Sequence, residues 1–215
     1  IRDFERHGID VSGMKMRQEE TTSLSIVLSD RETNGRSIVY RRGSAQSLRP
    51  EELDNEILEN CEWFFISHIT GVSMEATKRA KNAGAKVIVD ADSYSSELME
   101  HIDLIDAFVG SEFFYDVLFH DKNYEENCKK VCEMGPSIVV FTLGAKGCVG
   151  YSKEEGFFEL PSFDAVVQDT VGAGDVFHGA YVVGLLRGYS AKEAARLATA
   201  VSCICLLYTS DAADD

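Results

Sequence analysis

Short apolar runs that alternate with helical patterns constrain the fold of this chain more than any other feature. The clearest run, Ser137–Thr142, is rich in β-branched residues, which favour strands. Apolar runs of this length are typical of strands buried on both faces of a parallel sheet. The expected strands of this kind span residues 63–67, 86–90, 105–109 and 137–142. Helical patterns near residues 74–82, 96–101, 112–119 and 124–134 separate them. This alternation predicts an α/β fold with a mostly parallel sheet covered by helices.

The first part of the chain predicts a small accessory hairpin. Thr22–Ser29 alternates loosely between apolar and polar residues, as a half-buried strand does. Asn34-Gly35 is a strong hairpin turn signal, and Ser37–Tyr40 is expected to return as the partner strand. A helix is expected to follow from Pro50, with Leu53, Ile57 and Leu58 on its inner face.

The last part of the chain predicts an antiparallel pair and two long helices. Gly147–Ser152 and Gly156–Leu160 form the expected pair, and Ala165–Gln168 reads as a further strand. The helices are expected at Ala173–Arg187, apolar nearly all round and therefore buried, and at Ala191–Leu206. Ser190 and Glu193 match a capping box at the start of the second helix.

Composition excludes several classes of partner. The net charge of −15 argues against nucleic acid and against an anionic membrane surface, because both require basic patches. No apolar run reaches the length of a membrane span, and no signal peptide is visible. None of the six cysteines lies in a C-x-x-C pair, so they are expected to be reduced thiols in a cytoplasmic protein. The chain starts in what reads as the middle of a domain, so it is interpreted as a truncated piece.

The segment Asp169-Thr170-Val171-Gly172-Ala173-Gly174-Asp175 carries the chemistry. Its glycines stand where a helix is expected to begin, and the first N–H groups of a helix have no intrahelical acceptor. Together with the helix dipole, these donors can hold an anion and stabilise a phosphoryl group during transfer. Asp175 lies in the first turn, where a carboxylate can take a proton from an attacking hydroxyl. A simple glycine-rich turn before a helix, with Asp175 as a helix-start acid, explains the spacing equally well.

Known phosphate-binding motifs do not match this segment. The chain contains no G-x-x-x-x-G-K-[ST] loop, and Phe177 stands where the third glycine of a dinucleotide fingerprint belongs. A methyltransferase-type cofactor loop is a remaining alternative, although such a loop normally opens its domain. The five histidines show no metal-ligand spacing. His178 is treated like the others, although it lies one turn into the helix that starts near Ala173.

A second glycine-containing block follows the strongest strand. Thr142-Leu143-Gly144-Ala145-Lys146-Gly147 places a hydroxyl and two glycines at the carboxyl end of that strand. Ligands bind at this edge of an α/β sheet, and glycines let the backbone approach them. A plain β-turn is the competing interpretation.

The two blocks together resemble the PfkB, or ribokinase, family of carbohydrate kinases over about residues 1–206. The resemblance implies a three-layer ribokinase-like fold with a mostly parallel central sheet flanked by helices, and a partial small β lid at residues 21–41. It also implies that Gly172, Ala173 and Gly174 form an anion hole and that Asp175 is the catalytic base.

The same resemblance implies the ligands. ATP, Mg²⁺ and a small-molecule sugar are expected, with a monovalent cation such as K⁺ near Asp169 and Thr170, and a homodimer formed through the lid. The implied nucleotide-binding residues are Thr142, Gly144, Lys146, Gly147, Asp169, Thr170 and Ser111. The implied metal residues are Asp90 and Glu112. The chain departs from the family's N-x-x-E motif, because Ser111 stands for the Asn and Phe114 for the Glu.

Three questions stay open at the level of sequence. The chain is expected to phosphorylate a sugar hydroxyl, but an inactive nucleotide-binding fragment of such a kinase fits the same residues. The residues that choose the sugar lie largely outside this chain. The tail at 207–215 breaks the preceding helical pattern, so it is either an exposed tail or non-native sequence.

Overall fold

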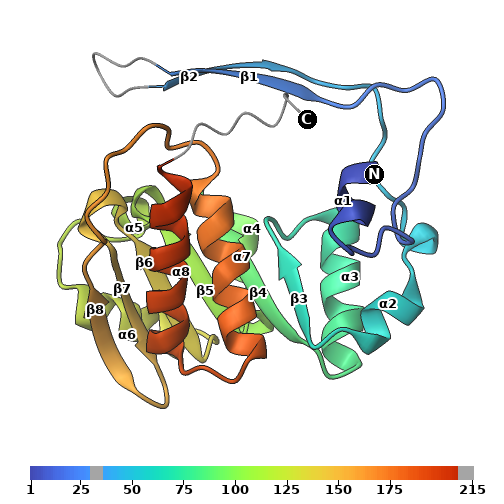
Figure 1. Ribbon diagram of the computed structural model, residues 1–215. Helices are drawn as coiled ribbons and strands as arrows, with labels where there is room; N and C mark the ends of the chain where they lie inside the picture. Colours follow the sequence, from blue (N-terminus) through green and yellow to red (C-terminus); the bar gives the residue numbers. More distant parts are fainter. Residues whose placement is uncertain (30–35, 208–215) are drawn as a thin grey trace. The chain divides into compact units, whose positions relative to one another are not determined.

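The computed structural model describes residues 1–29 and 36–207 (Figure 1). It divides into two compact units, Ile1–Ile57 and Leu58–Asp215, which are described separately. Helix α2, Asn55–Asn60, spans the division. The prediction of one kinase domain over 1–206 with a lid at 21–41 stays a prediction. The tail residues 208–215 lie outside the described part of the chain.

The larger unit is built on a six-stranded sheet in the order β3-β4-β5-β6-β7-β8. The first three pairings are parallel and the last two are antiparallel. The strands are β3 Trp63–Ile66, β4 Lys86–Ala91, β5 Ala107–Ser111, β6 Ile138–Thr142, β7 Cys148–Ser152 and β8 Gly156–Leu160. The predicted parallel α/β sheet and antiparallel pair are confirmed, with β5 displaced by two residues from its predicted position at 105–109.

Helices cover both faces of this sheet. They are α3 Gly71–Asn82, α4 Ser96–Glu100, α5 Glu112–Leu118, α6 Tyr124–Glu133, α7 Ala173–Leu186 and α8 Ala191–Cys205. Short 3₁₀ turns occupy Ile102–Leu104 and Gly144–Lys146. Figure 1 shows α7 and α8, coloured orange and red, side by side across one face of the sheet.

The two faces carry two separate hydrophobic cores because strand residues alternate in direction. Val89 and Phe108 point into the core that α3 to α6 complete, whereas Ile88 and Val109 point into the core beneath α7 and α8. This arrangement is a three-layer α/β architecture, as predicted. The predicted capping box of α8 is also present, with Ser190 and Glu193 bonding each other's backbone N–H.

Four sequence predictions about local structure are corrected. β3 is an edge strand rather than a buried one, and Phe65 on it is 44% exposed. Residues 165–168 form no strand: Val166 is 76% exposed, and Gln168 N–H donates instead to Leu206 O at the end of α8. α7 buries one face only, since Val183 and Leu186 are exposed.

The helix predicted from Pro50 is the fourth correction. It breaks into a 3₁₀ turn at Pro50–Glu52 and the separate helix α2. The break occurs because Leu53 is extended and Asp54 Oδ1 accepts the N–H groups of Glu56 and Ile57, as a capping residue does.

The smaller unit contains helix α1, Arg2–Arg6, and the predicted hairpin. Strands β1, Leu24–Ser29, and β2, Arg36–Arg41, pair in antiparallel register. The Asn34-Gly35 turn signal lies outside the described residues. Arg17 binds Glu52 through two parallel hydrogen bonds of 2.8 and 2.7 Å, which tie the loop before the hairpin to the turn after it.

All six cysteines are free, and Cys128, Cys132 and Cys148 are buried. Among residues 1–29 and 36–207, no helix is both long and apolar enough to cross a membrane.

Candidate functional site

A cavity of about 520 Å³ lies in the larger unit between the strand ends and the helices α7 and α8. This volume falls in the range of ordinary small-molecule sites. Its wall comes from the turn after β6, the loop after β8, the start of α7 and one side of α8. The lining residues are Thr142, Gly144, Ala145, Gly147, Ser162, Phe163, Asp164, Ala165, Val167, Thr170, Ala173, Gly174, Phe177, Thr199, Ser202, Cys203 and Leu206. The two glycine blocks, far apart in sequence, therefore meet in one cavity.

The turn after β6 has a shape that requires glycine at position 147. Leu143 N–H donates to Gly147 O at 2.8 Å and closes the turn. Gly147 has φ of 97°, and a Cβ there would lie 2.0 Å from Leu160 O, so no other residue fits. Ser162 Oγ donates to Ala145 O at 2.6 Å and holds the loop after β8 against the turn.

The start of α7 is shaped by a left-handed glycine. Gly172 precedes the helix with φ of 76° and ψ of −4°. Asp169 Oδ1 accepts Val171 N–H at 2.9 Å and tightens the approach to this turn. The first bond of the helix runs from Val176 N–H to Gly172 O at 2.9 Å. Ala173 N–H donates to Thr170 O at 3.4 Å. The next N–H groups along, those of Gly174 and Asp175, are the donors that this helix end can offer to a ligand.

The space beside these glycines is open. A Cβ built on Gly172 or Gly174 would meet no heavy atom within 4 Å. Gly174 also lines the cavity, so ligand atoms can approach its backbone closely. From the far side, Ser202 Oγ donates to Ala173 O at 2.8 Å and ties this turn to α8. Asp175 follows at once and is exposed.

A buried acid–histidine pair lies behind Asp175. His178 Nε2 is 3.3 Å from Asp90 Oδ1, and the two side chains are 8% and 18% exposed. His178 Nδ1 is 2.7 Å from Gly174 O. Burial raises the pKa of Asp90, His178 opposes that rise, and the carboxylates of Asp92 and Asp175 add to it.

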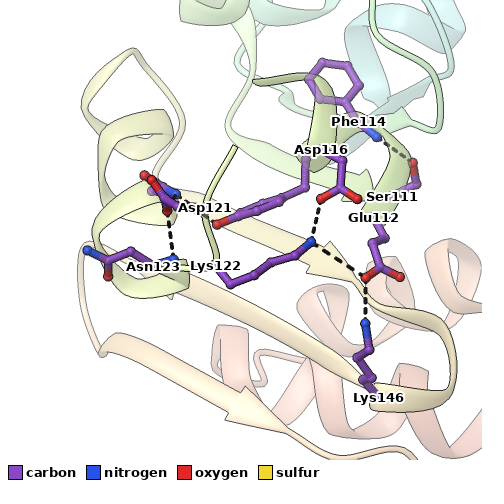
Figure 2. A network of polar contacts seen from close by, with 10 residues as sticks. Ser111, Glu112, Phe114, Asp116, Asp121, Lys122, Asn123 and Lys146 are labelled. Atoms are coloured by element: carbon purple, nitrogen blue, oxygen red, sulfur yellow. Dashed lines mark hydrogen bonds and ion pairs between the residues drawn. The ribbon is translucent and has the colours of Figure 1, made fainter. Parts of the chain in front are cut away.

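A polar network fixes the turn after β6 to α5 (Figure 2). Figure 2 shows the Glu112 carboxylate between the ammonium groups of Lys146, at 2.8 Å, and Lys122, at 3.9 Å. Ser111 Oγ accepts Phe114 N–H as the N-cap of α5 and donates to Asp92 O. Thr142 Oγ1 donates to Gly110 O at 3.4 Å. Ser111 and Glu112 are thus engaged by protein groups.

The structure brings together only some of the predicted site residues. Those that line the cavity are Thr142, Gly144, Gly147, Thr170, Ala173 and Gly174. Those that do not are Lys146, Asp169, Gly172, Asp175, Ser111, Asp90 and Glu112. Gly172, Asp169 and Asp175 still adjoin it in sequence, whereas Lys146 and Glu112 pair with each other. The roles of all these residues remain predictions.

The predicted metal residues do not gather into a metal site. Among residues 1–29 and 36–207, no group of three or more His, Cys, Asp or Glu side chains could hold an ion. Asp90 contacts His178, and Glu112 lies beside two lysines whose positive charge disfavours a cation there. Phe114, at the place of the family's Glu, is fully buried and offers no carboxylate.

Sequence reasoning missed the contribution of α8 and of His178. Thr199, Ser202 and Cys203 line the cavity from α8, for which the sequence predicted only a helix with a capping box. The available signal was a row of small and polar residues on that helix. His178 was set aside for lack of metal-ligand spacing. Its position four residues after Gly174 was the signal that it could reach back to the first turn.

Comparisons with known proteins indicate the family of the chain. The sequence model of the pfkB family of carbohydrate kinases matches residues 1–214. The 5-dehydro-2-deoxygluconokinase of Clostridium perfringens is 24% identical, over 92% of this chain and 65% of its own length. The 2-dehydro-3-deoxygluconokinase of Thermoproteus tenax is 26% identical, over 92% and 66%. The chain thus spans about two thirds of the length of these relatives.

Solved structures share the fold. Ribokinase from Thermotoga maritima superimposes with a TM-score of 0.81 at 25% identity, over 96% of this chain and 69% of that one. A protein from E. coli described as ribokinase II, in complex with ATP and Mg²⁺, gives a TM-score of 0.85 at 22% identity, over 97% and 72%.

Proposed function

Because the chain belongs to the pfkB family of carbohydrate kinases, we propose that it transfers the γ-phosphoryl group of ATP to a hydroxyl of a small sugar. The observation that carries this proposal is the meeting of two glycine blocks in one cavity. One block is the turn at Thr142–Gly147, and the other is the start of α7 at Gly172–Gly174.

The cavity suits a nucleotide. Phe163, Val167 and Leu206 give it an apolar portion that fits a base. Thr142, Thr170 and the backbone at Gly174 give it polar groups toward the start of α7. The open space at Gly174 leaves room for phosphate oxygens next to backbone donors, which is how helix ends bind phosphate.

The chemistry needs a base and a site for negative charge. Asp175 takes the proton of the sugar hydroxyl, whose oxygen forms a bond to the γ-phosphorus while the bond from that phosphorus to the β–γ bridging oxygen breaks. The products are a sugar phosphate and ADP. The N–H groups of the turn at Gly172–Gly174 stabilise the charge on the phosphoryl oxygens during this transfer.

Magnesium would enter with the nucleotide. The described residues provide no three-ligand site, and Mg²⁺ in kinases is held largely by phosphate oxygens and water. When bound, it would neutralise phosphate charge. A monovalent cation near Asp169 and Thr170 remains a prediction from the family resemblance.

The Asp175→Asn variant tests the proposed function. The wild-type chain is expected to bind ATP in a calorimetric titration and to phosphorylate at least one member of a sugar panel. The variant is expected to keep ATP binding and to lose turnover by a factor of about 10² to 10⁴. Equal turnover in both proteins would refute the assignment of the base.

The same titrations separate the alternatives. A chain that binds ATP but phosphorylates no sugar would be the nucleotide-binding part of such a kinase. Binding of S-adenosylmethionine in place of ATP would favour the methyltransferase-type alternative and refute the kinase.

We also propose a homodimer formed through the hairpin β1–β2. Ile26 and Val39 share one face, which is the face proposed to form the dimer, and Ile38 and Tyr40 lie on the other; all four are more than half exposed. An isolated two-stranded sheet is marginally stable in water, so it needs cover. Sedimentation equilibrium should show a dimer that Ile26→Asp dissociates and the control Ser25→Asp, on the opposite face, does not. A monomeric wild-type chain would refute this proposal.

A further inference from the structure

The imidazole of His178 is surrounded by oxygen atoms that accept hydrogen bonds. Nδ1 lies 2.7 Å from Gly174 O, four residues earlier in α7. Nε2 lies 3.3 Å from Asp90 Oδ1 and 3.5 Å from Val109 O. The ring is buried, and the rings of Phe65 and Phe177 contact it edge-on at centroid distances of 6.1 Å. A side chain enclosed in this way has one available orientation.

The acceptors around the ring determine which of its nitrogen atoms must donate a hydrogen bond. A carbonyl oxygen only accepts, so Nδ1 must carry the hydrogen that bonds Gly174 O. The contact between Nε2 and Asp90 then needs a hydrogen of its own, on either the ring or the carboxyl group. In both cases one hydrogen bond runs to the helix and another to the sheet. His178 is therefore a bridge between the first turn of α7 and the strand β4.

One end of this bridge lies in the proposed phosphoryl-binding turn, and the other lies in the central sheet. Gly174 belongs to the turn that would hold the phosphoryl group. A hydrogen bond that fixes its C=O therefore also restricts the neighbouring N–H donors. Asp90 lies in β4, which is paired on both sides, by β3 and by β5, and its register partner on β5 is Val109. The bridge thus connects the helix end at Gly174 to a strand that is paired on both sides.

We propose that His178 and Asp90 form a positioning pair that fixes the first turn of α7, and with it the anion hole, against the carboxyl end of β4. This inference rests on the proposed kinase function. The pair touches no substrate in this role and acts through the backbone of Gly174. Preorganised donors stabilise a transition state because they need no rearrangement when charge develops.

Hydrogen exchange tests the position directly, without any ligand. In the full chain, His178→Ala and Asp90→Ala are each expected to speed exchange of the Val176 to His178 amides at least tenfold, the effect of losing a charge-assisted bond. Amides in the last two turns of α7 should change less than about twofold, since the bridge lies outside them. Asp90→Asn can still donate from its amide to Nε2, so it should stay closer to wild type than Asp90→Ala. His120→Ala, an exposed histidine, is the matched control.

Ligand titrations on the same proteins separate positioning from mere stability. His178→Ala should weaken ATP binding at least tenfold while leaving adenosine binding within about twofold, because adenosine does not reach the anion hole. Where a sugar is turned over, His178→Ala and Asp90→Ala should lower kcat by a larger factor than they change the KM for that sugar. Asp90→Asn should keep most of the wild-type kcat. Equal weakening of ATP and adenosine, or no change in either, would overturn the inference.

The experiments distinguish a failure of the positioning pair from a failure of the proposed kinase function. If Asp175→Asn abolishes turnover while His178→Ala behaves as wild type, the kinase assignment stands and the positioning pair is refuted. If the wild-type chain binds no ATP, the proposed function fails and the inference that rests on it fails as well.

Discussion

Replacing Gly174 with alanine separates the structural role of this residue from its role at the site. Gly174 lies in the first turn of α7 with ordinary helical φ, and a Cβ there meets no heavy atom within 4 Å. The protein itself therefore accommodates the methyl group without strain. Alanine is better than glycine within a helix by up to about 1 kcal/mol. For a domain of this size, the melting temperature should stay unchanged or rise by up to about 2–4 °C.

ATP binding, in contrast to the melting temperature, should be weakened by Gly174→Ala. The methyl group would project into the cavity that Gly174 lines and keep ligand atoms away from the backbone N–H groups. Losing one charge-assisted hydrogen bond to a phosphate costs about 1.5–3 kcal/mol, which corresponds to about 10- to 150-fold weaker ATP binding. Calorimetric titration with ATP measures this loss, and differential scanning calorimetry measures the melting temperature of the same sample.

The matched control is Gly179→Ala in the same helix. Gly179 also has open space at Cβ, but it does not line the cavity. The substitution should raise the melting temperature by a similar amount and leave ATP binding unchanged. Wild-type ATP affinity in Gly174→Ala would refute the close approach of phosphate to this turn. A lower melting temperature in Gly174→Ala would refute the geometry on which the argument depends.

Three further substitutions test the packing and charges of the larger unit. Gly184→Ala should destabilise it by about 1–3 kcal/mol in urea unfolding, because a Cβ there lies 2.9 Å from Ala194 Cα in α8; unchanged stability would contradict this close packing. Burial raises the pKa of Cys128 to about 12, so its stabilising effect is complete below the unfolded pKa of ~8.5 and is lost as pH rises toward 12. Between pH 8 and 10 the wild type should therefore lose about 2 kcal/mol more than Cys128→Ala, and equal losses would contradict this. Glu112→Ala should cost less than about 1 kcal/mol because its partner Lys146 is mostly exposed; a larger drop, unaffected by added salt, would contradict a surface ion pair.

The sheet was predictable because its strands are nearly all interior. Val87–Val89 and Val139–Phe141 are fully buried, and such runs identify themselves by apolar composition alone. Prediction failed where neighbours in space decide the outcome. Phe65 looks like a core residue, but in the described part of the chain β3 pairs with β4 alone. Nothing in a local window distinguishes an edge strand from a central one.

Loops were harder because specific polar contacts replace periodicity in them. The residues 165–168 have strand-forming composition, yet their backbone bonds to the end of α8. The break after Glu52 depends on Asp54 capping a new helix, and the sequence between Pro50 and Leu58 gives no clear periodic sign of it. Turn and cap chemistry competes with helix propensity at such positions.

The sequence predicted the glycines of the candidate site, but not the side chains that hold the start of α7 in place. Gly147 and Gly172 both have positive φ, which only glycine adopts without strain. The glycines in the sequence therefore indicate where these two turns lie. Ser202 and His178 support the start of α7 from other directions. Their residue types are common on helices, and their role becomes visible only when their contacts are known.

The electrostatics of the site are compatible with the proposed binding of a triphosphate by this acidic chain. The net charge of −15 would repel phosphate if the nearby carboxylates were unpaired. Two nearby carboxylates are compensated, since Asp90 is paired with His178 and Glu112 is paired with Lys146 and Lys122. Both contacts compensate negative charge close to the cavity, while the helix end contributes partial positive charge within it. Asp164 lines the cavity as an exposed residue. Asp175 is an exposed residue directly after Gly174, as its proposed role as the base for a sugar hydroxyl requires.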